Sequence, residues 1–355
     1  MVRQLRRRSS WLAGLAAIGL LAGACGGDGG GSGTKPGQVT KVKIGSGAFS
    51  ITPSAVLLAK EMGYFLEEGI DAELFETGGG ANSMSAVVSG SADFAAVVIK
   101  DTIDAARKQD VYAVTVALLM ARETGGLVIR KKFAEDRGIT EDMSLADKVK
   151  RMKGARLATQ GLGSAQEARW RLMFREYGDG LDASKDAKLL VIQGGTSAQV
   201  AALRSNQVDA LTTAPPVPEQ LVADGQAIWL ANLMLGDVER LRDVPFFGLA
   251  TNEKNVKERP QVVEAVTRAV GRAQKLIQED PTTASDRLYK AYFSDVDAAV
   301  WKEVFAGMQQ AAAKNPVLSE HAVKRLYEES YGEQPDRFAE RLFDRTITEK
   351  VTASL

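Results

Sequence analysis

The 355-residue chain contains few of the residues that catalysis and metal binding use most. It has one cysteine, Cys25, and one histidine, His321, which lies in a charged helical stretch near the C-terminus. A single cysteine excludes an internal disulfide and a cysteine metal site, and one distant histidine leaves no Ser-His-Asp set. Lys and Arg together number 45, as do Asp and Glu, a balance that is not typical of nucleic-acid binders. We therefore expect no metal, no cofactor and no nucleic-acid partner.

The N-terminal region contains the longest uncharged apolar run. Four arginines lie within the first eight residues, and residues 11–24 carry no charge and are mostly Leu, Ala, Ile and Gly. This run is shorter than the ~20 residues that a membrane-spanning helix needs. A basic start, a short apolar core and small residues at its end predict a secretory signal peptide over residues 1–24.

The end of this segment resembles a bacterial lipobox. It reads Leu21-Ala22-Gly23-Ala24-Cys25, and the resemblance implies cleavage before Cys25 and lipid on that cysteine. The alternative is an ordinary signal peptide followed by a chance cysteine, which the absence of any other cysteine disfavours. Residues 26–37 are rich in Gly, a composition typical of flexible coil, so we expect a lipidated tether over 25–39. The tether would hold the protein on the outer face of the cytoplasmic membrane, or in a periplasm.

An internal repeat predicts the architecture. Residues 74–95 and 190–211 align without a gap, and each copy reads as an apolar run, a glycine turn, a short helix and a second apolar run. The identical pairs are Gly78 and Gly194, Gly79 and Gly195, Ala86 and Ala202, Ser89 and Ser205, and Asp93 and Asp209. A strand–helix–strand unit implies parallel strands and a right-handed crossover. The repeat favours two similar α/β lobes, and chance similarity of two units within one domain is the alternative.

Two extended apolar segments predict where the chain passes between the lobes. Residues 127–130 read as a strand leaving the first lobe, and residues 246–250 as a segment that returns to it. Beyond Pro260 the chain is nearly all helical, with apolar stripes that need a partner. We therefore predict lobe one from 40–130 plus 246–355 and lobe two from 131–245, with the C-terminal helices on lobe one. Two crossings make a hinge, and a hinge between two lobes makes a cleft.

The ends of the predicted strands are candidate ligand-binding positions. In open parallel sheets a ligand lies beyond the carboxyl ends of the strands, and here four such ends are Gly- or Ser-rich turns that lead into helices. Helix N-termini offer unpaired N–H groups and a positive dipole end, so several together would bind an oxyanion. Any one turn alone is equally well an ordinary strand–helix connection. The candidates are Ser46, Gly79, Gly80, Ala81, Asn82, Gly161, Gly163, Ser164, Ala165 and Gly195.

Other candidates follow neighbouring strands or could stack on a flat ligand. Lys100 either contacts an anion or is a solvated charge at the rim, and Thr213 follows the corresponding strand of the second copy. Arg122 either packs against Glu123 or reaches the cleft. Phe49 and Phe246 are aromatic rings near the same edges. Trp170 lies well inside its predicted helix, so we place it in the core.

Several segments resemble a known family. Residues 54–73 resemble the opening of periplasmic solute-binding proteins of the sulfonate, nitrate and taurine type, a group that includes binders of the thiamine pyrimidine precursor. Residues 89–93, 146–154 and 247–260 resemble further motifs of that family. The resemblance implies an α/β, two-lobed type II periplasmic-binding-protein fold whose ligand contacts come from the turns named above. This chain differs from better-known members at Lys100 and Asp101, where a small or hydroxyl residue is common.

The resemblance also implies a role in transport. We expect a monomeric receptor that captures a small polar or anionic organic solute of the sulfonate, nitrate or taurine type and delivers it to an ABC permease and its ATPase. A pyrimidine or other aromatic vitamin precursor is the alternative ligand. An enzyme on the same fold is a more distant alternative, because the related fungal pyrimidine synthase uses a cysteine cluster and its own histidine. We therefore expect no catalytic activity.

Overall fold

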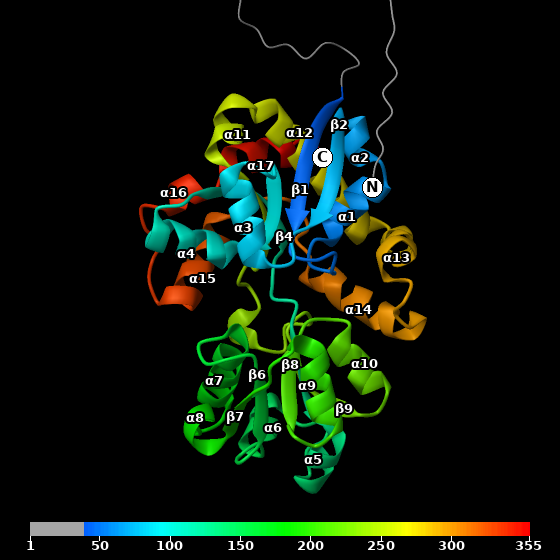
Figure 1. Ribbon diagram of the computed structural model, residues 1–355, viewed down its shortest axis with the longest axis vertical. Helices are drawn as coiled ribbons and strands as arrows, with labels where there is room; N and C mark the ends of the chain where they lie inside the picture. The colour runs from blue at the N-terminus through cyan, green and yellow to red at the C-terminus, as the bar shows by residue number, and fades with distance from the viewer. Residues whose placement is uncertain (1–38) are drawn as a thin grey trace, which may run out of the picture. The chain divides into compact units, whose positions relative to one another are not determined.

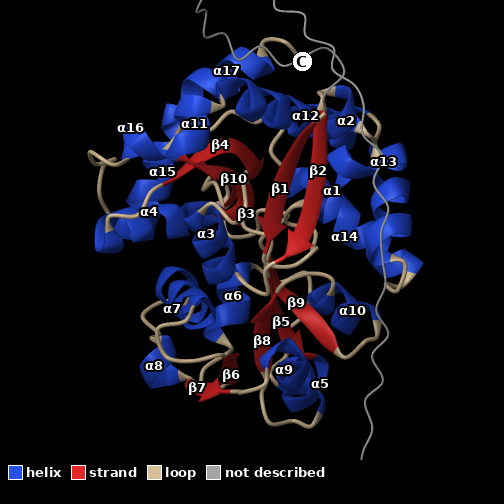
Figure 2. Cartoon of the chain, turned by 45° about the horizontal axis from the view of Figure 1, so that its top comes forward, coloured by secondary structure: helices blue, strands red, loops and turns tan. Residues whose placement is uncertain are grey.

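The computed structural model describes residues 39–355. The predicted signal peptide, the lipidation site Cys25 and almost all of the tether lie outside this range. The described chain forms two five-stranded sheets with the orders β2-β1-β3-β10-β4 and β7-β6-β8-β5-β9 (Figure 1). Helices cover the faces of both sheets (Figure 2). We call the first sheet with its helices lobe one, and the second sheet with its helices lobe two.

The sheet of lobe one combines parallel strands with one antiparallel strand. Strand β1 pairs in parallel with β2 and β3, and β10 runs antiparallel between β3 and β4. Buried Val42 and Ile44 alternate with exposed Lys41 and Lys43 along β1, the period-two pattern of a half-buried strand. The strands are β1 Thr40–Ser46, β2 Ile70–Glu76, β3 Phe94–Val98, β4 Ala113–Met120 and β10 Phe247–Asn252.

The sheet of lobe two repeats this arrangement. Strand β6 pairs in parallel with β7 and β8, and β5 runs antiparallel between β8 and β9. The strands are β5 Gly126–Arg130, β6 Arg156–Thr159, β7 Lys188–Val191, β8 Ala210–Thr213 and β9 Ala227–Asn232. The sequence places residues 127–130 at the end of lobe one, but β5 belongs to lobe two. The chain therefore crosses between β4 and β5, because the apolar β5 completes the second sheet.

The helices divide between the two lobes (Figure 1). In lobe two they are α5 Lys131–Asp136, α6 Leu145–Lys150, α7 Ala165–Tyr177, α8 Ala183–Asp186, α9 Gly195–Arg204 and α10 Val217–Ala223, with the 3-10 turn Glu239–Leu241 before the return to lobe one. In the first part of lobe one they are α1 Ser54–Glu61, α2 Tyr64–Glu67, α3 Gly80–Ser89 and α4 Ile99–Gln109.

The C-terminal helices pack on lobe one, as the sequence predicts. They are α11 Glu253–Glu258, α12 Pro260–Glu279, α13 Pro281–Leu288, the π-helical turn Tyr289–Phe293, α14 Ala298–Ala311, α15 Glu320–Tyr331, α16 Ala339–Leu342 and α17 Arg345–Thr352. Pro260 fits the first position of α12, where its missing N–H costs nothing. The apolar stripe of α12 joins the core formed with β1 and β4. The Oγ1 of Thr267 also donates a hydrogen bond to the carbonyl of Val116 at 3.3 Å.

The repeated aspartates have the same structural task in both lobes. Asp93 accepts hydrogen bonds from the backbone N–H of Lys43 at 2.8 Å and from Arg259 at 2.6 Å. Asp209 accepts the backbone N–H of Arg156 at 2.9 Å, and its carboxylate also pairs with the side chains of Arg156 and Arg130. Each aspartate thus ties the start of one strand to its neighbour, so the identity in the repeat reflects the sheet and not a ligand.

Trp170 lies in the core of lobe two, as expected. Its side chain is fully buried, and its indole Nε1 donates to the carbonyl oxygen of Ala158 at 2.9 Å. None of the helices within residues 39–355 is long and apolar enough to cross a membrane.

Candidate functional site

A cavity of about 700 Å³ lies between the two lobes. Its walls combine the N-terminal turns of α4 and α7 with the segment before β10 and with α15. The lining residues are Val98, Lys100, Asp101, Glu123, Gly163, Ser164, Ala165, Ala168, Arg169, Leu172, Arg175, Leu241, Val244, Pro245, Phe246, Leu326, Glu329 and Ser330. The cavity is therefore formed by chain segments that are far apart in the sequence.

Five of the residues predicted from the sequence line this cavity. They are Lys100, Gly163, Ser164, Ala165 and Phe246. The remaining candidates, Ser46, Phe49, Gly79, Gly80, Ala81, Asn82, Arg122, Gly161, Gly195 and Thr213, lie at strand ends or crossings but are not part of its lining.

The N-terminus of α7 is closed by its own side chains. Ser164 is the N-cap, and its Oγ accepts the N–H of Glu167 at 3.2 Å and shares a hydrogen bond with Thr159 Oγ1 at 2.8 Å. The Glu167 carboxylate reaches back to the N–H of Gly163, the residue before the N-cap, an arrangement similar to a capping box. The pKa of Glu167 falls below its ordinary value because of this N–H and the neighbouring Arg171. The backbone N–H groups of Gly163 and Glu167 thus already donate hydrogen bonds within the protein. Fewer N–H donors therefore remain for an oxyanion at this helix end than the sequence predicts.

The turns of lobe one hold one another by similar bonds. Asn82 donates its side-chain amide to the carbonyl of Thr77 at 2.8 Å, and Thr77 Oγ1 and Ser83 Oγ lie 2.7 Å apart. A Cβ at Gly47 would lie 3.3 Å from the backbone of Gly79, so glycine allows these two turns to approach closely. Asn82 therefore shapes the turn and is not part of the cavity lining.

Two of the predicted aromatic rings have different surroundings. Phe49 packs edge-on against Tyr292 with ring centroids 5.8 Å apart, and it lies against the core of lobe one. Its backbone N–H donates to Glu76 at 2.6 Å. Phe246 lines the cavity beside Val244 and Pro245. Phe246 is therefore the ring that can face a bound molecule.

The charged side chains around the cavity are paired with one another. Lys100 Nζ lies 2.7 Å from Asp104 Oδ2 and 5.2 Å from the ring centroid of Tyr331. Arg169 pairs with Glu123, and Arg175 Nε lies 3.0 Å from Glu176. Each cationic side chain of the lining thus has an acidic partner within residues 39–355, and Lys100 is a paired charge at the rim.

Arg122 departs from both positions that the sequence allows, and Asp101 is a further residue of the cavity wall. Arg122 neither pairs with Glu123 nor lines the cavity, because Nη1 donates to the carbonyl of Met234 at 3.2 Å across the two crossing segments. Asp101 lines the cavity and stays exposed to solvent on one side, and partial loss of water around its carboxyl raises its pKa against the opposing effect of Lys100. Asp101 accepts no hydrogen bond from the described part of the chain, so its carboxylate is available to a ligand.

The turns of lobe two are linked to each other by side-chain hydrogen bonds. Thr213 is buried, and its hydroxyl lies 3.5 Å from that of Thr196 at the start of α9. The buried amides of Gln166 and Gln199 exchange two hydrogen bonds of 2.8 and 3.1 Å, which join α7 to α9. The turn at Gly195 therefore keeps a fixed position relative to α7.

Most of the cavity wall is formed by residues that no sequence motif indicates. Ala168, Arg169 and Leu172 follow Ala165 at helical spacing, so the face of α7 that begins at Ala165 is a signal that could have identified them. Leu326 and Glu329 come from α15, more than 150 residues away in the chain. No local pattern could have indicated them.

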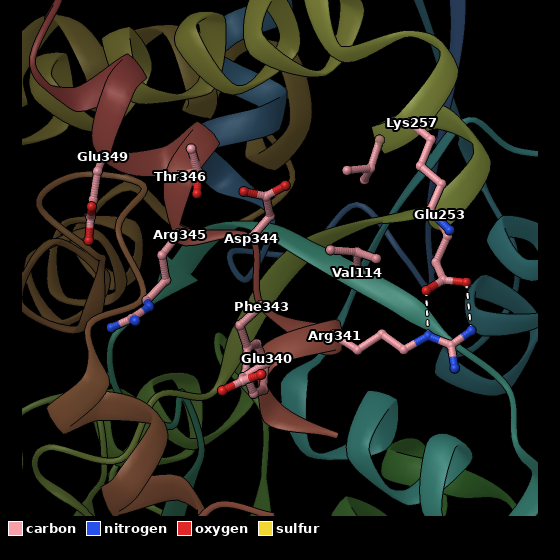
Figure 3. A pocket seen from close by; sticks show the side chains of 11 residues that line it. Val114, Glu253, Lys257, Glu340, Arg341, Phe343, Asp344, Arg345, Thr346 and Glu349 are labelled. Atoms are coloured by element: carbon pink, nitrogen blue, oxygen red, sulfur yellow. Dashed lines mark hydrogen bonds and ion pairs between the residues drawn. The ribbon is translucent and has the colours of Figure 1, made fainter. Parts of the chain in front are cut away.

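A second hollow lies on lobe one between α11 and the last two helices. Figure 3 shows Arg341 reaching Glu253 with two hydrogen bonds across this hollow, while Arg345, Asp344 and Glu349 line its other side. Asp344 caps α17 through the N–H of Ile347 at 3.0 Å. These charges serve the packing of α16 and α17, and no residue predicted from the sequence lies among them.

Metal binding has no clear location in this structure. Within residues 39–355 no group of three or more His, Cys, Asp or Glu side chains could hold a metal ion. His321 lies exposed on α15 and is not part of the cavity lining.

Comparison with known proteins assigns the family. The model of the NMT1-like family matches residues 35–288, and no curated protein sequence matches the chain. The alkanesulfonate-binding protein SsuA from Xanthomonas axonopodis pv. citri, solved with MOPS bound, is 20% identical with a TM-score of 0.59, over 88% of this chain and 98% of that one. The periplasmic nitrate-binding protein NrtA from Synechocystis PCC 6803 is 17% identical with a TM-score of 0.64, over 90% and 89%.

A third similar structure names the fold itself. A Candida albicans protein described as having the generic periplasmic binding protein fold is 12% identical with a TM-score of 0.61, over 86% of this chain and 97% of that one. At these identities the similarity establishes the fold. The chain belongs to the NMT1-like family and has the two-lobed type II periplasmic-binding-protein fold that its sequence predicts.

Proposed function

We propose that this protein is the solute-binding receptor of an ABC importer, which captures a small polar or anionic organic solute between its lobes and delivers it to a permease. The observation that carries the proposal is the cavity of about 700 Å³ lined by both lobes. The cavity includes Val98 at the end of β3 and the turn that follows β6, and the ends of parallel strands are where α/β sheets bind ligands. Proteins of known structure that resemble this chain include binders of alkanesulfonate and nitrate.

Lobe closure is the mechanism that fits this arrangement. The chain passes between the lobes twice, between β4 and β5 and between β9 and β10, and such short crossings act as hinges. A solute that contacts Phe246 on one side and the start of α7 on the other would bind the closed form better than the open form. Differential affinity of this kind shifts the population toward closure, and the closed form would be the one that the permease recognises.

The cavity lining favours an organic solute over a bare inorganic anion. Val98, Leu172 and Phe246 supply apolar surface, and the cations of the lining are already paired with carboxylates. An anionic group would therefore be held by the backbone N–H groups that the capping of α7 does not use and by the paired cations, while the rest of the molecule contacts the apolar wall. Phe246 also keeps a flat ligand, such as a pyrimidine or other aromatic vitamin precursor, as the second candidate. We propose no catalytic role.

A solute panel tests the proposal. We expect one solute among sulfonates, nitrate, taurine, aromatic acids and pyrimidines to raise the melting temperature, since a ligand at a hundredfold excess over its Kd stabilises the native state by about 2.7 kcal/mol. Ala168 is exposed in the cavity, so Ala168→Trp should remove the shift. Ala201→Trp, at an exposed position on α9 outside the lining, is the matched control. No shift with any solute, together with no molecule in native mass spectra of the purified protein, would count against the receptor.

A further inference from the structure

Glu219 is a buried carboxyl with no partner. It lies in the first turn of α10, where only 5% of the residue is exposed. Neither Oε1 nor Oε2 has a hydrogen-bond partner among residues 39–355. Burying an ionised carboxylate without a partner is strongly unfavourable, whereas the neutral acid is tolerated far better. The arrangement seen here therefore favours a neutral Glu219.

The helix that carries Glu219 contacts the other lobe. Helix α10 packs on β5, β8 and β9 of its own lobe and on α14 of lobe one (Figure 1). The neighbouring charge that affects the Glu219 carboxyl is that of Glu303, which belongs to α14. One turn further along α14, Gly307 would place a Cβ 2.9 Å from the side chain of Met234, which follows β9. The contact of α10 with α14 and the approach of α14 to Met234 both lie where the two lobes meet.

The other charges nearby do not neutralise Glu219. Strands β8 and β9 carry no charged residue, and Arg130 at the end of β5 pairs with Asp209 at 3.0 Å. On α14, Lys302 lines a groove toward α13, beside Ser285 and Asp286. Glu303 has the same sign as Glu219, so its approach opposes ionisation. The lobe–lobe contact thus offers Glu219 no cation and one further negative charge.

These surroundings change the acidity of the group. Burial raises the pKa of Glu219 from 4.5 to about 7, its own backbone N–H acts in the opposite direction, and Glu303 adds to the increase. When the lobes move apart and water reaches the carboxyl, its pKa should return toward 4.5. The form with the lobes in contact therefore binds the proton more tightly.

We propose that Glu219 couples the contact between the two lobes to protonation: α10 and α14 lie together when its carboxyl is neutral, and the contact loosens when it ionises. The inference concerns regulation of the same lobe movement as the proposed function, and it needs no solute. By linkage, the contact is fully favoured below pH 4.5, is lost progressively as the pH rises toward 7, and stays weaker above that. One proton changes the equilibrium between the two forms by at most about tenfold per pH unit.

The test measures compactness and stability without solute. Small-angle X-ray scattering of the purified wild-type protein should give a larger radius of gyration at pH 8 than at pH 5.5. Glu219→Gln, a neutral side chain of the same shape, should remain compact at both values. The Glu303→Gln protein should expand at a lower pH than the wild type, because loss of the neighbouring negative charge makes Glu219 ionise more easily. Glu135→Gln, at an exposed position on α5, should leave the transition unchanged.

Three outcomes would overturn the proposal. They are a wild-type radius that does not change with pH, a Glu219→Gln protein that expands like the wild type, or a Glu303→Gln transition at the wild-type pH. If Glu219→Gln does not fold, the wild-type and Glu303→Gln curves still decide the question. The scattering measurements need no solute, so their outcome does not depend on whether the panel finds one. The receptor proposal and the protonation proposal can therefore fail independently.

Discussion

Leu162 is an exposed apolar side chain at the edge of the interlobe cavity. It exposes 78% of its surface, more than any other large apolar residue in the described chain. It lies between Gly161 and Gly163, directly before the residues of α7 that line the cavity. An isolated surface leucine needs no explanation in general, but one beside a closing cleft can become buried when a solute binds.

We predict that Leu162→Ala weakens solute binding without changing the stability of the solute-free protein. Burying the three carbons that the substitution removes contributes about 1–2 kcal/mol, so Kd should rise about five- to thirtyfold, as measured by calorimetry with the solute that the panel selects. Leu66→Ala, at 57% exposure on α2, is the control and should leave Kd unchanged. An unaltered Kd for Leu162→Ala would mean that this side chain stays in water after closure.

At the scale of elements, the repeat predicts more than any single motif does. The alternation of apolar runs, glycine turns and short helices was enough to predict two similar sheets, and Trp170 was placed in the core by its position in a helix. Strand β5 was assigned to the wrong lobe because its composition suits either sheet, and only pairing with β8 and β9 decides it.

The cavity was less predictable, for a physical reason. A turn such as Gly163–Ala165 is visible in the sequence, but the partner of each polar group in it is not. The Glu167 carboxylate accepts a hydrogen bond from the N–H of Gly163. Glu123 pairs with Arg169 and not with its neighbour Arg122. These choices depend on distances between segments that come together only in the folded chain. The contribution of helix α15 to the cavity wall is hidden in the sequence for the same reason, because it depends on how distant segments pack.

Asp209 joins three strands of lobe two, so its removal should destabilise the fold. Its side chain is 4% exposed and pairs with Arg130 and Arg156. We predict that Asp209→Asn lowers the free energy of unfolding by about 3 kcal/mol, because two arginines lose a buried charge partner. Asp93→Asn is the matched control from the repeat: its side chain is 24% exposed and pairs with one arginine, so its loss should be smaller. Urea unfolding at pH 7 measures both.

The effect of Asp209 should also depend on pH. Burial raises the pKa of Asp209, but hydrogen bonds from Arg156 and Arg130 outweigh it, and the pKa lies below its ordinary value of 3.8. A depressed pKa stabilises the folded state above the ordinary value and loses this effect as the pH falls through the folded value. The difference between wild type and Asp209→Asn should therefore be full at pH 7 and shrink below pH 4. Equal losses at pH 7 and pH 3 would show that the carboxylate charge is not the source of the effect.

At the scale of the whole molecule, the proposed receptor has to stay near its permease while its lobes move. The Gly-rich tether predicted for residues 25–39 would allow this, since a coil of about 14 residues has a mean reach of roughly 20 Å. We predict that mass spectrometry of protein extracted from membranes finds residue 25 at the N-terminus and a lipid on Cys25. Cys25→Ser should remove the lipid and the cut before residue 25, while Ser32→Ala, seven residues further along, should keep both. An unmodified Cys25, or an N-terminus elsewhere, would reduce the segment to an ordinary secretory signal and leave the receptor free to diffuse from its permease.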